Sequence, residues 1–374
     1  MSGIYLHIPF CTSKCNYCGF YSIPSQKRMD VFLEALHQEI ALRKDYLHGE
    51  PVETVYFGGG TPSLLKVEDL RNILGSLSEQ FQLIPQAEIT LEANPDTLSP
   101  DYLNALRTLG INRLSIGIQS FFDDDLKYLG RRHNATHARQ CLLWAKEAGF
   151  ENITVDLIYG LPTADAGQWE HDLDTFFELA IPHLSAYALT LEPNAILTKQ
   201  IEMGKAVPVN EDDAVRDYAI LCQKMAQHGF EHYEISNFCK PGWHSRHNTA
   251  YWNHIPYLGL GPSAHSFDGA TRQWNVASVE EYCRSQKTGA RGWEEETLTM
   301  EQRYDEYVML RLRTMWGIDL EHIRQRFGEA YSDYCEKQAQ PLMAQGRLSR
   351  KGQTFYLTDE QMLFADGIAE TLFW

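Results

Sequence analysis

A chain of 374 residues is longer than one compact core usually organises, so its length predicts two units or a barrel with an added unit. Lys and Arg number 33 against 50 Asp and Glu, and the resulting charge of −17 argues against a protein that binds by neutralising nucleic-acid phosphates. A hydrophobic content of 44% excludes a disordered chain. No stretch approaches the roughly 20 apolar residues of a membrane span, and no signal peptide precedes the first predicted strand, so we expect a cytoplasmic protein.

The first two-thirds of the chain alternate between short strand-like runs and longer helical patterns. The predicted strands are Ile4–Ile8, Thr54–Phe57, Glu88–Glu92, Arg113–Ile118, Ile153–Ile158, Leu184–Leu191 and a segment near His232–Ile235. Helical spacing is found in three segments. The first has Phe32, Leu33, Leu36 and Ile40 on one face, the second runs from about Ala135 to Ala148, and the third runs from Asp212 to Gln227. This alternation predicts parallel strands in an α/β fold. We expect a partial (β/α)6-type barrel, with a doubly wound sheet as the alternative.

Polar or glycine-rich features close four successive predicted strands. They are Gly58–Gly60, Glu92 with Asn94, Gln119 and Asp156. Because the carboxyl ends of barrel strands and their loops carry the functional site, these residues are the candidate site.

The alternation breaks after about residue 237. His244–Phe267 is rich in Gly, Pro, His and aromatic residues, and helical patterns follow at Asp305–Arg326 and Ala330–Gln345. Arg347–Thr358 predicts a short hairpin that turns at Lys351-Gly352 before a final helix. We therefore expect a core over residues 1–237, a connecting segment over 238–294, and a largely helical, winged-helix-like domain over 295–374.

Three of the eight cysteines lie in the loop directly after the first strand, at Cys11, Cys15 and Cys18. The other five are scattered singly and are expected to be reduced and mostly buried. Three thiolates this close can face one point, and sulfur ligands favour zinc or an iron–sulfur cluster. Zinc requires a fourth ligand, for which His7 is a candidate. Both metal centres remain open on spacing alone.

The cysteine spacing, with an aromatic residue at Tyr17, resembles the signature of radical S-adenosylmethionine (SAM) proteins. One β/α unit later, Gly58-Gly59-Gly60-Thr61-Pro62 resembles the glycine-rich motif of that superfamily. Glycines at a strand end let the backbone approach a ligand closely. The resemblance implies that the cysteines hold a [4Fe–4S] cluster whose fourth iron binds SAM. In the superfamily the reduced cluster cleaves SAM to a 5′-deoxyadenosyl radical.

Further stretches resemble the coproporphyrinogen-dehydrogenase-like branch of the superfamily. In the order of that branch they are Ile4–Cys11, Phe57–Pro62, Leu91–Pro95, Ser115–Phe121 and Val155–Pro162. Position by position, the resemblance implies SAM contacts at Tyr5, Gly59, Gly60, Thr61, Glu92, Gln119, Arg131 and Asp156. Individually, these residues also fit ordinary roles, such as a satisfied buried amide for Gln119 or a solvated loop charge for Arg131.

Two departures from the dehydrogenases of this branch concern the N-terminal part of the chain. The dehydrogenases have a further cysteine two residues after the third ligand, where this sequence has Phe20. Only ten residues precede Cys11, whereas the dehydrogenases have a longer N-terminal segment. Both departures argue against coproporphyrinogen decarboxylation and resemble the heme-chaperone group of the branch.

The segment His247-Asn248-Thr249-Ala250-Tyr251-Trp252 matches the HNxxYW motif of that group. A histidine with Tyr and Trp one turn later offers an axial heme ligand beside aromatic faces. The resemblance implies a heme site at His247, Asn248, Tyr251 and Trp252, with His247 as the leading ligand. His244, His254 and His265 are weaker candidates for the ligand. The alternative is an aromatic loop that caps the barrel with His247 hydrogen-bonded inside it.

The leading hypothesis is a heme-binding chaperone with a [4Fe–4S] cluster and SAM that delivers heme to respiratory proteins. The family also implies a homodimer, and we allow for a peripheral membrane contact. The alternatives are a radical SAM enzyme that acts on a tetrapyrrole and a radical SAM enzyme that modifies RNA or protein. The acidic charge and the absence of an aromatic-and-basic stripe argue against a nucleic-acid partner.

Overall fold

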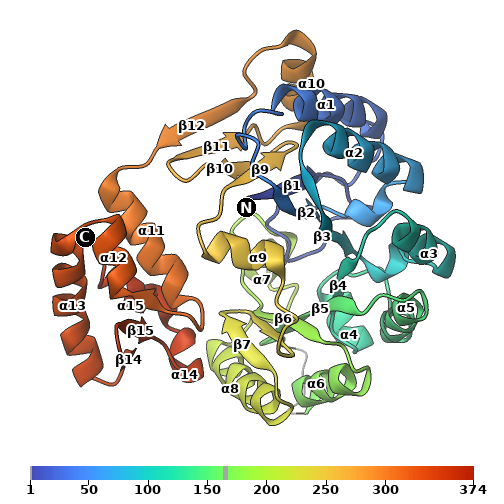
Figure 1. Ribbon diagram of the computed structural model, residues 1–374. Helices are drawn as coiled ribbons and strands as arrows, with labels where there is room; N and C mark the ends of the chain where they lie inside the picture. Colours follow the sequence, from blue (N-terminus) through green and yellow to red (C-terminus); the bar gives the residue numbers. More distant parts are fainter. Residues whose placement is uncertain (1, 163–166) are drawn as a thin grey trace.

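A curved sheet with helices on its outer face forms the main body of the computed structural model, which describes residues 2–162 and 167–374 (Figure 1). Six parallel strands follow one another in sequence order: β1 (Ser2–Ile8), β2 (Val52–Gly59), β3 (Leu83–Ala93), β4 (Arg113–Gln119), β5 (Asn152–Tyr159) and β6 (His183–Ala188). The connecting helices are α1 (Met29–Leu42), α2 (Val67–Gln80), α3 (Pro100–Thr108), α4 (Asp123–Tyr128), α5 (Ala135–Glu147) and α6 (Gln168–Glu178). The predicted partial barrel is confirmed.

Further strands extend this sheet at both edges. On one side β9 (Tyr257–Leu260) pairs parallel with β1, and the antiparallel strands β10 (His265–Phe267), β11 (Thr271–Asn275) and β12 (Trp293–Thr297) follow. On the other side β8 (Asn237–Cys239) and β7 (Glu231–Glu234) form a hairpin antiparallel to β6. The strand predicted near His232–Ile235 is therefore part of an edge hairpin and does not continue the parallel series.

The apolar pattern of each element explains its place in the core. In α1, Phe32, Leu36 and Ile40 are fully buried, whereas Leu33 is only partly buried at the margin of the same face. All seven residues of β4 are buried, as expected for a parallel strand covered on both sides. Farther along the chain, α7 (Ile196–Glu202) and α8 (Glu211–Gln227) follow β6.

A buried carboxylate joins the β9 edge of the sheet to the first helix. Glu39 of α1 is fully buried and accepts hydrogen bonds from the Gly261 amide (2.8 Å), the Asn275 side chain (2.7 Å) and the Tyr282 hydroxyl (2.7 Å). Tyr282 belongs to α10 (Val279–Thr288), which thereby packs beside α1. The Gly259–Gly261 turn thus has a structural role at this edge.

The C-terminal unit has its own hydrophobic core and a small antiparallel sheet. Its elements are α11 (Met300–Leu312), β13 (Ile318–Asp319), α12 (Leu320–Arg326), α13 (Glu329–Ala344), β14 (Ser349–Lys351), β15 (Thr354–Tyr356), α14 (Asp359–Met362) and α15 (Ala365–Glu370). The predicted hairpin is present, and the predicted final helix is two short helices.

The single helix predicted over Asp305–Arg326 is wrong, because the chain breaks it before β13. Gly317 has a φ of +64°, and a Cβ at this position would lie 2.1 Å from the Phe355 carbonyl oxygen. Close pairing of β13 with β15 therefore requires glycine here and ends the helix. Helical periodicity alone does not reveal this tertiary contact.

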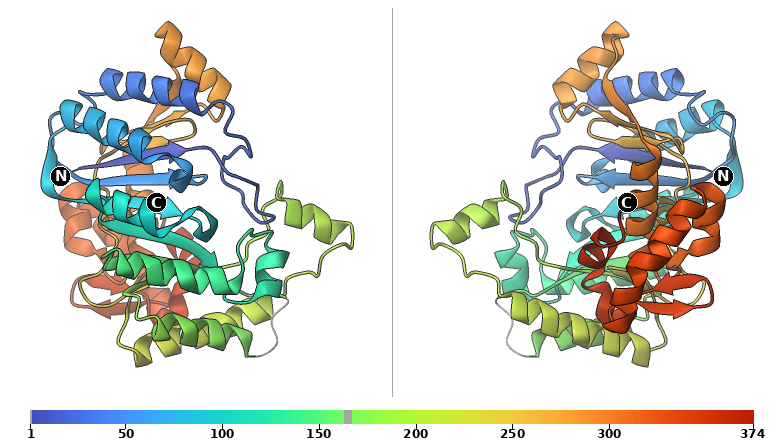
Figure 2. Two further views of the ribbon diagram at one scale, coloured as in Figure 1. Left: turned by 90° about the vertical axis from the view of Figure 1, so that its right-hand side faces the viewer. Right: turned by 90° about the vertical axis from the view of Figure 1, so that its left-hand side faces the viewer.

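The C-terminal unit packs against the β7 edge of the barrel (Figures 1 and 2). The Tyr218 hydroxyl donates to the Asp359 carbonyl (2.9 Å), and the Ile235 amide donates to the Arg313 carbonyl (2.9 Å). His232 Nδ1 lies 3.0 Å from the Asp359 carboxylate. Within the described residues, no helix is both long enough and apolar enough to cross a membrane.

Candidate cofactor site

A cavity of about 380 Å³ opens where the parallel strands of the barrel end. We call it the cofactor cavity. It is lined by ten of the residues predicted to hold the cluster and SAM: Cys11, Cys15, Cys18, Gly59, Gly60, Thr61, Glu92, Gln119, Arg131 and Asp156. These residues come from five different β/α units, and the fold gathers them because parallel strands present their carboxyl ends at one edge.

The glycine-rich turn after β2 fixes the loop that carries the cysteines. The Gly60 amide donates to the Ile8 carbonyl (2.9 Å), and the Thr61 amide donates to the Phe10 carbonyl (2.8 Å). A Cβ at position 60 would lie 2.7 Å from the Phe10 carbonyl oxygen. Only glycine allows this approach of the two backbones, so the motif sets where the cysteine loop begins.

A chain of polar contacts connects the cysteine loop to three neighbouring strands. The Thr61 hydroxyl lies 3.5 Å from Cys11 Sγ and accepts from the Asn94 amide (3.1 Å). Arg131 donates to Asn94 (2.7 Å) and lies 3.4 Å from Cys15 Sγ. Asn94, a candidate site residue from its place at a strand end, thus bridges Thr61 and Arg131.

The cysteine loop is held from the other side by α7, as Figure 2 shows at the carboxyl edge of the sheet. The Leu197 amide of α7 donates to the Asn16 carbonyl (2.7 Å), and the Asn16 side chain donates to the Tyr128 carbonyl (2.9 Å). Burial, and then the neighbouring thiols, raise the pKa of Cys18. A metal centre would therefore be needed to keep this thiol deprotonated.

The geometry fits a cluster better than a zinc ion held by the three cysteines and His7. Both ring nitrogens of His7 are engaged, Nδ1 with the Tyr5 hydroxyl (3.1 Å) and Nε2 with the Tyr21 carbonyl (2.9 Å). Tetrahedral zinc would bring its sulfur ligands within about 4 Å of one another. Among the described residues, the loop cysteines are not grouped within 4.8 Å of one another.

Two partly buried carboxylates line this cavity. Burial raises the pKa of Glu92 to about 7, although its carboxylate accepts from the Tyr56 hydroxyl (2.9 Å) and the Gly59 amide (3.2 Å). Burial likewise raises the pKa of Asp156 to about 6, against a hydrogen bond from Ser115 (3.2 Å). Burying a carboxylate without a cation is costly, so both positions suit a positively charged ligand such as SAM.

The guanidinium of Arg113 also lines the cofactor cavity and is only 1% exposed. It donates to the Thr154 hydroxyl (2.5 Å). Its charge offsets part of the rise that burial causes in the pKa of Glu92 and of Asp156. Sequence reasoning missed its role, because a lone arginine at the start of a strand gives no signal of a cavity.

Gln119 has a backbone conformation that is unusual for a residue with a side chain. Its φ is +73°, and the pairing of β4 with β5 shifts register between Gly117 and Gln119. The side-chain oxygen accepts from the Tyr187 hydroxyl (3.1 Å) in the cavity wall. Such a conformation costs about 1–3 kcal/mol and is typically retained at functional sites.

Tyr5, which was also predicted to contact SAM, does not line this cavity. Its ring stacks on Tyr56 with centroids 6.1 Å apart, and its hydroxyl contacts His7. It therefore supports the wall from behind, through Tyr56.

The HNxxYW motif forms helix α9 (Arg246–Trp252) inside the curve of the sheet. His247 is buried, with Nδ1 2.7 Å from the Thr54 hydroxyl and Nε2 2.8 Å from the Tyr251 hydroxyl. Burial lowers the pKa of His247 to about 3, so the imidazole is neutral. Both of its nitrogens are engaged in this structure.

The other residues of the motif face open space. Asn248 lines the cofactor cavity and also a second cavity of about 350 Å³, here called the central cavity. Tyr251 and Trp252 line the central cavity only. The structure thus brings three of the four predicted heme-site residues together at one cavity, with His247 behind them.

Comparison with known proteins agrees with this architecture. The family model of the radical SAM superfamily matches residues 5–176, and that of the HemN C-terminal domain matches residues 298–364. The chain is 34% identical to the heme chaperone HemW of Bacillus subtilis (strain 168), over 98% of each chain, and 32% identical to that of Escherichia coli (strain K12), over 98% of this chain and 97% of the relative.

Among solved structures, coproporphyrinogen III oxidase (HemN) from Escherichia coli, described as a radical SAM enzyme, superimposes with a TM-score of 0.83 at 26% identity. The alignment covers 99% of this chain and 89% of HemN. The superfamily implies a [4Fe–4S] cluster and SAM as cofactors, and the cysteine loop and the carboxylates of Glu92 and Asp156 fit both. The chain belongs to the HemW family of the radical SAM superfamily.

Proposed function

We propose that the protein is a heme chaperone: it binds heme and transfers it to acceptor hemoproteins, with a [4Fe–4S] cluster and SAM as cofactors. The observation that carries the proposal is the position of α9. One residue of its motif, Asn248, lines both the cofactor cavity and the central cavity. A heme beside the motif would thus lie next to the cofactors.

The chain's own residues hold the cofactors in defined roles. Cys11, Cys15 and Cys18 supply three thiolates, which leaves one iron of the cluster for SAM. Glu92 and Asp156 offer acceptors to the cationic groups of SAM. When bound, the cluster supplies one-electron reduction.

The heme site is proposed at His247, Asn248, Tyr251 and Trp252. Three of these residues line open space, whereas ligation of iron by His247 would require its bond to Thr54 or Tyr251 to break. His247 would therefore ligate iron only after one of these two hydrogen bonds is lost.

The test is anaerobic reconstitution of the cluster followed by titration with hemin, recorded as difference spectra against the same sample without hemin. We expect a Soret band that saturates at a single equivalent of hemin. If the full-length chain gives no saturable Soret change, the heme chaperone proposal is wrong.

A second candidate function is a radical SAM enzyme that acts on a tetrapyrrole, favoured by the TM-score of 0.83 with HemN. Phe20, at the place of the further cysteine of the dehydrogenases, lines the cofactor cavity and is 72% exposed. We expect no protoporphyrinogen when the reconstituted chain is incubated with SAM, reductant and coproporphyrinogen. Its appearance would favour the enzyme.

We further propose a cytoplasmic protein that forms a homodimer and meets respiratory acceptors through a peripheral membrane contact. Light scattering of the chain with and without the cluster tests the dimer. Co-sedimentation with anionic vesicles tests the membrane contact.

A further inference from the structure

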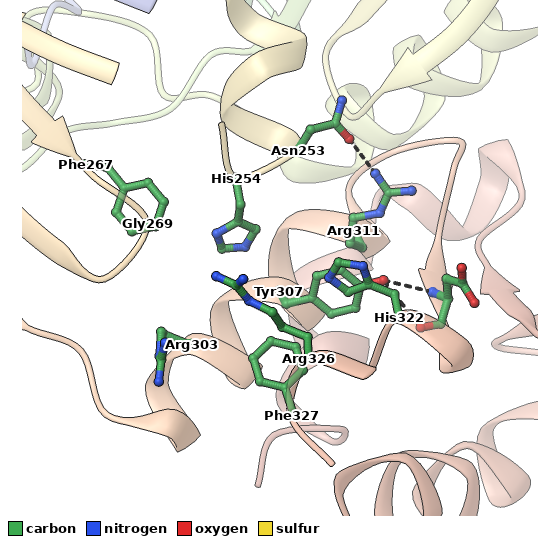
Figure 3. A pocket seen from close by; sticks show the side chains of 11 residues that line it. Asn253, His254, Phe267, Gly269, Arg303, Tyr307, Arg311, His322, Arg326 and Phe327 are labelled. Carbon is green, nitrogen blue, oxygen red and sulfur yellow. Dashed lines mark hydrogen bonds between the residues drawn. The ribbon is translucent and has the colours of Figure 1, made fainter. Parts of the chain in front are cut away.

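A third cavity, of about 380 Å³, lies between the β9–β12 edge of the sheet and the C-terminal unit (Figure 3). We call it the outer cavity. It is lined by the end of the α9 segment, by β10 and by helices α11 and α12. His254 and Phe267 line both the outer and the central cavity, so the two spaces share a wall. Its volume lies within the range of small-molecule sites.

Aromatic rings form much of the wall of the outer cavity. His322 stacks on Tyr307 at 4.7 Å between centroids and an angle of 15°, and Tyr307 lies 5.9 Å from Phe327. On the opposite side, Phe267 lies 5.9 Å from His254. Flat apolar faces of this kind suit a large conjugated ring.

The cavity also concentrates positive charge in a chain whose net charge is −17. Arg303 and Arg311 of α11 and Arg326 of α12 all line it. Among the described residues, none of these guanidinium groups forms an ion pair with a carboxylate, whereas the neighbouring Arg324 pairs with Glu321. Arg311 donates to the Asn253 side chain (2.7 Å) and the Gly317 carbonyl (2.8 Å), and Asp319 also lines the cavity. Arginine recognises carboxylates through paired hydrogen bonds, so an anionic ligand would provide acceptors for Arg303 and Arg326.

His254 supplies a candidate metal ligand at the shared wall. Its Nε2 atom is buried without a hydrogen-bond partner among the described residues, and its φ is +54°. Burial, and then the charge of Arg272, lower the pKa of His254 to about 4, so the ring is neutral at physiological pH. A buried nitrogen without a partner is unfavourable, and coordination to a metal would satisfy it. Figure 3 shows the ring facing the same space as the Arg326 guanidinium.

We propose that the outer cavity is a heme-binding site, in which His254 ligates the iron and Arg303 and Arg326 bind the propionates. A planar conjugated ring, a metal that takes imidazole and two carboxylates together match the aromatic wall, the unpartnered nitrogen and the unpaired arginines. This site is an alternative to the motif site for the single bound heme, because His254 lies outside the HNxxYW helix. The inference rests on the proposed heme function.

The experiment titrates the reconstituted full-length chain and its variants with hemin under the same difference-spectrum protocol. H254A should weaken hemin binding by at least about tenfold and change the Soret maximum, because an iron ligand is lost. The matched control is H228A, which removes an exposed histidine outside the three cavities. In H254G, added imidazole should restore the wild-type spectrum.

The arginines are tested with the same protocol. R303Q and R326Q should each weaken hemin binding by about tenfold, through loss of a charged hydrogen bond. R324Q, on the same helix as Arg326 but paired with Glu321, is the matched control. Heme dimethyl ester, which lacks free propionates, should bind wild type and R326Q with equal affinity.

The results separate the two proposals. If wild type binds hemin and H254A and H254G retain its affinity and spectrum, the outer-cavity assignment is wrong while the heme function stands. Loss of binding in H247A alone would lead to the same conclusion and assign the ligand to the motif. Circular dichroism and iron content of each variant identify loss of binding that is due to misfolding. If wild type itself does not bind, both proposals fail.

Discussion

The cofactor cavity and the outer cavity have nearly equal volumes but are built in opposite ways. In the cofactor cavity the polar side chains hold one another, as when Asn94 bridges Thr61 and Arg131. In the outer cavity Arg326 and the buried Nε2 of His254 lack such partners among the described residues. The polar groups of the cofactor cavity are therefore preorganised before any ligand binds. Those of the outer cavity find partners only when a ligand binds.

The difference extends to the two histidines nearest the proposed heme. His247 is closed off by two hydroxyl groups within the barrel, while His254 lies only seven positions later and has a free nitrogen. A motif histidine can therefore be a structural residue that holds α9, beside a second histidine that is available for ligation.

The largest expected effect is that of removing a cluster ligand. C15A should abolish the [4Fe–4S] cluster, because two thiolates cannot replace three at this loop. Iron content and the visible absorption of the reconstituted chain measure the loss. C283A, which removes a partly buried thiol outside the loop, is the control. If hemin binding to the outer cavity is independent of the cluster, C15A should bind hemin as wild type does.

A second variant asks whether His247 is structural. H247A should lower the free energy of unfolding by about 3 kcal/mol, because it creates a cavity and leaves Thr54 and Tyr251 without their partner. Urea denaturation of the cofactor-free chain measures the change. H228A, which removes an exposed ring stacked on Phe177, should lower the free energy of unfolding by no more than about 1 kcal/mol. A change in H247A as small as that in H228A would show that the buried hydrogen bonds do not stabilise the fold.

The pH dependence of SAM binding tests the electrostatics of the cofactor cavity. The pKa of Glu92 is raised to about 7, so the carboxylate gains a proton as the pH falls through 7 and loses its attraction for a cation. SAM affinity should therefore fall by about tenfold from pH 8 to pH 6, as measured by calorimetry. Asp156, with its pKa near 6, adds to this loss at lower pH.

The same shift has the opposite sign for the cofactor-free fold. Because burial raises the pKa of Glu92 above its value in the unfolded chain, the folded state binds the extra proton, and stability falls as the pH rises through 7. E92Q should weaken both the pH dependence of SAM affinity and the pH dependence of the free energy of unfolding. An affinity for SAM that is flat between pH 6 and 8 in wild type would contradict the assignment of Glu92.

The sequence predicts the cofactor cavity better than the outer cavity, because the residues of the cofactor cavity carry local sequence signals. The cysteine loop, the glycine turn and the strand ends at Glu92, Gln119 and Asp156 are local signals, and parallel strands necessarily bring them to one edge. Arg113, and the contacts by which Asn94 bridges Thr61 and Arg131, became recognisable only from the tertiary structure. The outer cavity joins His254 to Arg303 and Arg326 across the junction of two units, so no local pattern marks it. The break of the helix at Gly317, which shapes α11 and α12, likewise depends on contact with distant β15.

The smallest effect on stability is expected at Phe20. A substitution there tests whether the chain is a heme chaperone or an enzyme that acts on a tetrapyrrole. The side chain is 72% exposed, so F20C should change the free energy of unfolding by less than about 0.5 kcal/mol. The three existing thiolates should still hold the cluster, and hemin binding at the outer cavity should be unchanged, because Phe20 does not line that cavity. Protoporphyrinogen formation by F20C, but not by F20S, would show that a single thiol at the cavity mouth distinguishes the oxidase from this chain. The absence of product in both variants would place the difference elsewhere in the cavity.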